Sequence, residues 1–137
     1  MAMVHIHDIV CPHRSPFSIA PIAAATATQG NPIFAAPFTC KVRKVVYYFG
    51  ATVTGQATHY FNLNLFNRGT DGSGTTELAN RDYASGTNDT AFVAREVYAP
   101  ATYLSVATGV VLDLQRELVG TGLAMPAVWG YVEYEGA

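Results

Sequence analysis

Metal-binding side chains are concentrated at the start of the sequence, where His5, His7, Asp8, Cys11 and His13 lie within nine residues. In an extended strand His5 and His7 would point to the same face, and paired imidazoles suit zinc or copper. A tetrahedral site needs a complete ligand set, however, and no Cys-x-x-Cys pair or comparable second cluster follows. We therefore predict a polar terminal strand here, with no bound metal and no cofactor.

Side chains for catalysis are present, but their spacing is not typical of an enzyme. None of the five serines lies in a Gly-x-Ser-x-Gly sequence, and no neighbouring residue marks His59 as a base. Glu133 and Glu135 share one face of a predicted strand with Trp129 and Tyr131. That pattern fits a sugar site and fits a solvated acidic strand equally well. We predict no catalytic residue and a non-enzymatic protein, with a small cupin-like enzyme as a third, separate class.

Features that would bind phosphate or nucleic acid are weak. The glycine-rich segment 69–76 lacks the Gly-Lys-Ser/Thr ending of a phosphate loop, and no helix follows it, so we interpret it as a hairpin loop. Eight basic residues stand against ten acidic ones, with a modest basic stripe at Lys41, Arg43, Lys44 and Arg95. This balance predicts no nucleic-acid partner.

The composition is that of a single folded domain. The chain has 137 residues, of which 50% are hydrophobic and 13% charged, a combination that argues against a disordered chain. No apolar run approaches the roughly 20 residues that span a bilayer, and the first residues lack the pattern of a secretory signal. We expect a protein made inside a cell, with no membrane partner, in which Cys11 and Cys40 stay free thiols.

Proline and alanine set the first 37 residues apart. Five of the seven prolines lie there, and proline disfavours regular elements because it fixes φ and removes a backbone donor. We predict an extended N-terminal arm over residues 1–37, with a short strand at 33–36 at most, followed by a β domain over residues 38–137. The arm is too apolar for a solvated linker, so we expect it to lie on another surface, either that of its own domain or that of a neighbouring subunit. Of the two we predict the neighbouring subunit. Its predicted partner-binding anchors are Phe17, Ile19, Ile22, Ile33 and Phe34.

Strand patterns fill the remainder of the sequence, separated by turn signals about every 8–12 residues and by a polar, turn-rich stretch at 75–90. Segments of helical period are hard to find. The pattern predicts an all-β fold, an antiparallel β-sandwich of jelly-roll-like form, with Asn62 and Asn64 on a wet sheet face. The main predicted strands are 41–49, 60–67, 91–98, 103–106, 110–115 and 129–135. The predicted core contains Phe61, Leu63, Leu65, Val110, Leu112 and Leu114.

The order of these segments along the chain resembles that of a known family of proteins. A strand rich in Val and Tyr is followed by Tyr-Phe-Asn-Leu-Asn-Leu-Phe-Asn-Arg-Gly at 60–69, the loop 71–76, Gly-Val-Val-Leu-Asp-Leu at 109–114, and Gly-Thr-Gly-Leu-Ala-Met-Pro at 120–126 before the closing strand. Over roughly residues 38–135 this resembles the head decoration (cement) proteins of tailed bacteriophages, which have β-sandwich or jelly-roll domains. The resemblance rests on turn chemistry and strand patterning.

The resemblance implies a virion structural protein, made in the host cytoplasm. It implies a homotrimer that binds the major capsid protein on the outside of the head and stabilises the lattice. No residue-level function transfers, because the pattern marks a fold rather than a site. An alternative is a receptor- or glycan-binding virion module of the same fold, which would use exposed Tyr and Trp side chains.

Overall fold

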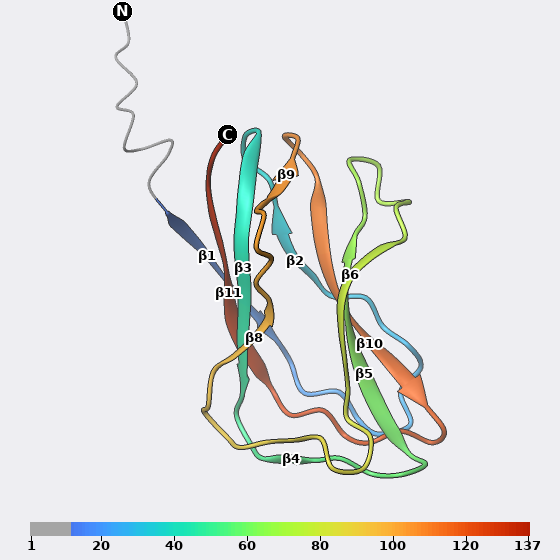
Figure 1. Ribbon diagram of the computed structural model, residues 1–137. Helices are drawn as coiled ribbons and strands as arrows, with labels where there is room; N and C mark the ends of the chain where they lie inside the picture. The colour runs from blue at the N-terminus through green and yellow to red at the C-terminus, as the bar shows by residue number, and fades with distance from the viewer. Residues whose placement is uncertain (1–11) are drawn as a thin grey trace, which may run out of the picture.

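The structure is a computed structural model that describes residues 12–137 (Figure 1). In this part of the chain every pairing between named strands is antiparallel, and the strands form two main sheets. The predicted all-β, antiparallel β-sandwich is therefore confirmed. No helix within residues 12–137 is long and apolar enough to cross a membrane.

The two main sheets face each other as layers, with a short two-stranded sheet at one end (Figure 1). The five-stranded sheet contains, in order, β1 (His13–Ile19), β11 (Val128–Gly136), β3 (Cys40–Phe49) and β8 (Arg95–Tyr98), with β9 (Leu104–Val106) also paired to β3. The four-stranded sheet contains, in order, β2 (Pro32–Ala35), β10 (Val111–Val119), β5 (Tyr60–Asn67) and β6 (Thr76–Asp82). The short sheet pairs β4 (Val53–Thr54) with β7 (Asn88–Asp89).

The strands are connected in the order of a jelly roll. Along the chain, β1 belongs to the five-stranded sheet, β2 to the four-stranded sheet, and β3 again to the five-stranded sheet. Strands β5 and β6 then follow in the four-stranded sheet. The chain then returns through β8, crosses to β10, and ends with β11 between β1 and β3. Two interlocked Greek keys of this kind occur in viral capsid proteins, lectins and cupins. The fold is thus compatible with each class of function that the sequence leaves open.

The core between the two sheets is apolar, and the predicted core is confirmed. All six predicted residues are buried, with exposures from 0% to 8%: Phe61, Leu63, Leu65, Val110, Leu112 and Leu114. On the opposite face of β5, Asn64 is only 4% exposed, so the expectation of a wet position is wrong for this residue. The side-chain amides of Asn62 and Asn64 both donate to Oε2 of Glu117 on β10, at 3.0 Å each. This shared acceptor ties the amides to the sheet surface.

Strands β1 and β2 correct the predicted boundary at residue 37. β1 pairs with β11 along its whole length, from His13 opposite Tyr134 to Ile19 opposite Val128. β2 pairs with β10 in the other sheet. Both are edge strands, where proline is tolerated because one row of backbone donors is left without a strand partner. The sandwich therefore extends back through the segment that was predicted to be an arm.

A buried arginine fastens the long loop between β1 and β2. Arg116 on β10 is fully buried, and its guanidinium donates to the carbonyls of Thr26 at 2.6 Å, Ala24 at 2.9 Å and Leu123 at 2.8 Å. Burial lowers the pKa of Arg116. Carbonyls in irregular loops lack the partners that a sheet supplies, and here one side chain satisfies two carbonyls of this loop and one of the loop between β10 and β11.

Two segments in the second half also differ from the prediction. Residues 76–82 form the edge strand β6, although their polar composition favoured a loop. An edge strand accepts such side chains because much of its surface faces solvent. Conversely, residues 91–94 precede β8 rather than opening it, because Phe92 has a φ of 62° that interrupts extended geometry.

Candidate interaction surfaces

The five predicted arm anchors lie in the core of their own chain. Ile19, Ile22, Ile33 and Phe34 are 5–7% exposed, and Phe17 packs against the same core. The ring of Phe17 covers Gly130 on β11, where a Cβ atom would lie only 2.7 Å from the ring. Four of these side chains are buried within their own chain, and Phe17 is partly buried against the same core, so the set does not form a surface that is free for a partner. This corrects the partner-binding role predicted for them.

The histidine-rich start of the sequence, for which we predict a polar strand without a metal, is only partly covered by the structure, because His5, His7, Asp8 and Cys11 lie outside the described residues. His13 opens β1 and stacks on the ring of a β11 tyrosine, with centroids 5.4 Å apart. Nδ1 of His59 accepts a hydrogen bond from the backbone of the turn between β10 and β11 at 3.0 Å. From residue 12 onward, no three His, Cys, Asp or Glu side chains are grouped so that they could hold a metal.

Two other sequence features have the structural roles predicted for them. The glycine-rich segment 69–76 lies in the hairpin between β5 and β6, where Gly69 and Gly72 have φ values of 70° and 80°. Cys40 is a free and fully buried thiol, and burial raises its pKa. The first is a loop and the second is a small buried hydrophobe.

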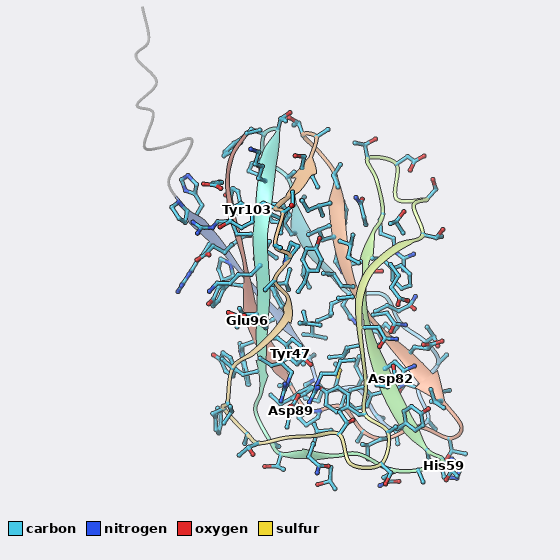
Figure 2. The ribbon with its side chains drawn as sticks, viewed as in Figure 1. Tyr47, His59, Asp82, Asp89, Glu96 and Tyr103 are labelled. Carbon is cyan, nitrogen blue, oxygen red and sulfur yellow. The ribbon has the colours of Figure 1, made fainter. Side chains whose placement is uncertain are left out.

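A buried carboxylate connects the two sheets near β6 and β8 (Figure 2). Asp89 on β7 is 4% exposed and accepts hydrogen bonds from Tyr83 at 2.5 Å, Arg81 at 2.9 Å and Arg95 at 2.6 Å. The hydroxyl of Tyr83 is also hydrogen-bonded to that of Tyr47, which comes from β3. These five side chains form one hydrogen-bonded group, which we call the Asp89 cluster.

Electrostatics keep the Asp89 cluster in one protonation state near neutral pH. Burial by itself raises the pKa of Asp89, but the hydrogen bonds from Arg95, Tyr83 and Arg81 outweigh it, so the pKa lies below its ordinary value. Burial is the largest cause that raises the pKa of Tyr83 and of Tyr47. The phenols therefore stay protonated beside an ionised carboxylate. Such a group links the two main sheets by hydrogen bonds and has a structural role.

The Asp89 cluster leads directly into an exposed loop, residues 90–94, which we call the apolar tip. Phe92 is 71% exposed and Val93 is 56% exposed. The backbone N of Phe92 donates to the carbonyl of Phe49 on β3 at 2.9 Å and holds the residue at its left-handed φ of 62°. Strain of this kind persists only where the surroundings impose it, and it clusters at functional positions. The apolar tip is therefore a candidate contact surface.

A second exposed apolar surface lies on the outer face of the five-stranded sheet. Tyr48 and Trp129 are cross-strand neighbours on β3 and β11, with ring centroids 5.9 Å apart and planes inclined by 25°. Arg14 on β1 places its guanidinium carbon 4.3 Å from the ring centroid of Tyr131. With Pro16 these residues line an open hollow of about 380 Å³, which we call the aromatic hollow.

Acidic and basic side chains border the aromatic hollow. Glu133 follows Tyr131 on the same face of β11, and its carboxylate oxygens lie 3.2 Å from Nε of Arg14 and 3.8 Å from Nε of Arg43. Lys44 on β3 pairs with Glu96 on β8 at 3.5 Å. Three of the four side chains in the predicted basic stripe, Arg43, Lys44 and Arg95, are thus engaged in ion pairs.

Sequence reasoning found part of the aromatic hollow and missed the Asp89 cluster. The alternation along β11 indicates that Trp129, Tyr131 and Glu133 share a face, but nothing in it identifies β1 as the neighbouring strand. The residues of the cluster come from four segments of the chain: β3, β6 with the residue that follows it, β7 and β8. Arg81 and Tyr83 are two residues apart, which is only a weak indication that they share a strand face. This spacing does not identify the carboxylate that they bind.

Comparison with known proteins identifies a fold rather than a family. No family model matches the sequence, and no curated protein matches it. A chain of the cyanophage Pam1 capsid asymmetric unit matches with a TM-score of 0.61 and 17% identity, over 100% of this chain and 93% of that one. The VP2 subviral particle of infectious bursal disease virus matches with a TM-score of 0.43 and 12% identity, over 93% of this chain and 33% of VP2. The protein therefore has the fold of a cyanophage capsid chain over its whole length.

Proposed function

We propose that the protein is a virion structural protein that decorates a phage head, binding the assembled capsid lattice from outside and stabilising it. The observation that carries the proposal is the similarity of fold to a cyanophage capsid chain of nearly the same length. The alignment covers 93% of that chain, so the shared jelly roll supports a structural role for this protein as well. The partner in this role is the major capsid protein.

The apolar tip suits attachment to a lattice. Its two exposed side chains, Phe92 and Val93, are carried by a loop whose backbone is bonded to β3 and whose base is held by Asp89. A surface fixed before binding loses less conformational entropy on association than a mobile one. Because the contact exists only in the assembled shell, each bound copy stabilises the shell by mass action.

Self-association belongs to the same proposal. A homotrimer would place three apolar tips around one symmetry axis, and simultaneous contacts raise the effective affinity well above that of a single tip. Sedimentation equilibrium of the purified protein measures the stoichiometry directly. A monomer at all accessible concentrations would remove the trimer from the proposal and leave single-copy attachment.

Attachment can be tested with heads that were assembled without this protein, from the major capsid protein encoded in the same genome. We expect the protein to sediment with these heads and to raise the temperature at which they disrupt. Replacing Phe92 and Val93 together by Ser should weaken binding at least tenfold, whereas Tyr103→Ser, at a residue 37% exposed on another part of the surface, should not. Failure of the unmodified protein to bind would overturn the decoration role, and full binding by the double variant would move the contact away from the tip.

A further inference from the structure

The indole ring of Trp129 is the flat floor of the aromatic hollow. A Cβ atom at Gly50 would lie 2.8 Å from Cζ3 of the indole, so the ring lies directly over glycine backbone that no side chain displaces. Tyr48 stacks against the indole, with ring centroids 5.9 Å apart and planes inclined by 25°, and also lines the hollow. Trp129 is nevertheless 41% exposed, although tryptophan is a residue that folding normally buries to a large extent. The result is an open aromatic platform.

Polar groups stand at one side of this platform. The side chain of Arg14 is 59% exposed and gives its Nε to Glu133 at 3.2 Å, which leaves its other N–H donors available to a bound molecule. The guanidinium is fixed by this ion pair and by the ring of Tyr131 beneath it. A flat apolar surface is thus bordered by a positioned donor and by a carboxylate that is already paired.

This combination matches the chemistry of a sugar ring. The C–H bonds on one face of a pyranose carry partial positive charge and pack against the negative face of an aromatic ring, while the hydroxyl groups at its edge need hydrogen-bond partners. A volume of about 380 Å³ lies within the range of small-molecule sites, roughly 300–1,000 Å³. We propose that the aromatic hollow binds a pyranose unit of an oligosaccharide, with the sugar stacked on Trp129 and hydrogen-bonded to Arg14.

The size of the hollow favours a small ligand over a protein partner, because about 380 Å³ suits a small molecule, whereas a stable protein interface covers roughly 800 Å² per partner. Arg, Tyr and Trp are also enriched at protein interfaces, so the test below includes self-association through this surface. The apolar tip is the surface without charged side chains among its exposed residues, and it suits a protein contact better. The sugar site is therefore separate from the proposed capsid contact, and each can exist without the other.

Trp129 provides a direct signal for the test, because it is the only tryptophan in the chain. Purified protein is titrated with soluble oligosaccharides chosen from a glycan array that includes neutral hexoses, N-acetylhexosamines and uronic acids. We expect a saturable change in tryptophan emission for at least one class. Calorimetry with the same oligosaccharide should then show affinity reduced at least tenfold in Trp129→Ala and several-fold in Arg14→Ala, with Tyr103→Ala unchanged as the matched exposed aromatic.

Each outcome bears on the proposal. If Trp129→Ala does not fold, the sugar site is tested with Arg14→Ala alone. This variant should fold, because the Arg14 side chain lies on the surface of an edge strand. The absence of any array ligand, or binding that is unaffected by both substitutions, would overturn the sugar site. Self-association that is lost in Trp129→Ala would show instead that a second copy occupies the hollow. None of these measurements uses heads, so they succeed or fail independently of the decoration role.

Discussion

A single buried carboxylate organises the most polar part of the interior. Asp89 accepts hydrogen bonds from two arginines and a tyrosine, which lie six to eight residues away in the sequence and belong to the segments on either side of β7. Removing one member of such a group leaves the other charges without their partner, and the penalty usually exceeds what the intact group contributes. The Asp89 cluster is therefore expected to be sensitive to changes that hardly alter its shape.

Replacing Asp89 by Asn should lower the free energy of unfolding by about 2–4 kcal/mol, because Arg81 and Arg95 lose the charge that balances them. The measurement is urea denaturation at pH 7. Asp82→Asn is the matched control, an exposed carboxylate on the neighbouring strand β6, and it should change stability by less than about 0.5 kcal/mol. Equal effects of the two substitutions would show that the buried position of Asp89 is irrelevant to stability.

The lowered pKa of Asp89 also predicts a pH dependence. In the unfolded chain an aspartate titrates near pH 3.9, and in the fold it titrates below that value. The stabilisation is therefore complete above about pH 4 and is lost as the pH falls through the folded pKa. The stability of the unmodified protein should decrease more steeply below pH 4 than that of Asp89→Asn, which has no carboxylate at this position. Parallel curves would contradict this.

Phe92 combines strain with exposure, so its replacement should not harm the fold. A left-handed φ costs a bulky residue about 1–2 kcal/mol, whereas glycine adopts it freely and loses part of that gain to backbone entropy. We expect Phe92→Gly to leave the free energy of unfolding unchanged or to raise it by up to about 1 kcal/mol. Denaturant melts measure this, and a loss above about 1 kcal/mol would show that the phenyl ring packs more tightly than its exposure indicates.

At the scale of elements, the edge strand β1 is required for the sandwich. Deleting residues 1–30 removes β1 and uncovers the central strand β11, so this truncation should abolish cooperative unfolding. Deleting residues 1–11 leaves every described strand in place and should change the melting temperature little. Circular dichroism and thermal melts of the two truncations measure the contrast. A folded 1–30 deletion would restore the arm interpretation of this segment.

The loop between β1 and β2 depends on Arg116 in a comparable way. Arg116→Ala leaves three carbonyls without a donor and opens a cavity, which should lower the free energy of unfolding by about 3 kcal/mol or more. Gln115→Ala changes the neighbouring residue on the other face of β10 and should lower it by less than about 1 kcal/mol. Proteolysis within residues 20–31 would also accelerate in the first variant alone.

The elements themselves show where sequence patterns suffice. Phe61, Leu63 and Leu65 alternate with asparagines, and this period fixes both the strand and its buried face. β1 alternates in burial, but its inner face begins with the polar residues His13 and Ser15 and its outer face contains Pro16, so its residue types show no apolar period and indicate an irregular arm. The two sites differ in the same way. The spacing of residues on β11 predicts one face of the hollow. In the Asp89 cluster Arg81, Tyr83 and Arg95 lie within eight residues of Asp89, but the path of the turns between them, which brings them together, does not follow from spacing.

At the scale of the whole molecule, most pairings join distant parts of the chain. The ion pair between Arg14 and Glu133 spans 119 residues, and it lies between the first and the last strand. Folds dominated by such contacts fold slowly, because loop entropy is lost before the contacts form. We expect refolding from urea to take milliseconds to seconds, measured by stopped-flow tryptophan fluorescence. A phase complete within microseconds would indicate that local structure dominates instead.

The central position of β11 has a consequence for biosynthesis. Strands β1 and β3 are made early, but they become neighbours of one strand only when the final residues, Val128–Gly136, fill the gap between them. At roughly 5–20 residues per second the ribosome leaves earlier strands waiting for several seconds with that gap open. A nascent chain thus exposes two unpaired strand edges until β11 has been synthesised, and a chain that stops before β11 never pairs them. Synthesis of β11 therefore serves as a quality check, because only a chain that contains it can form the continuous five-stranded sheet.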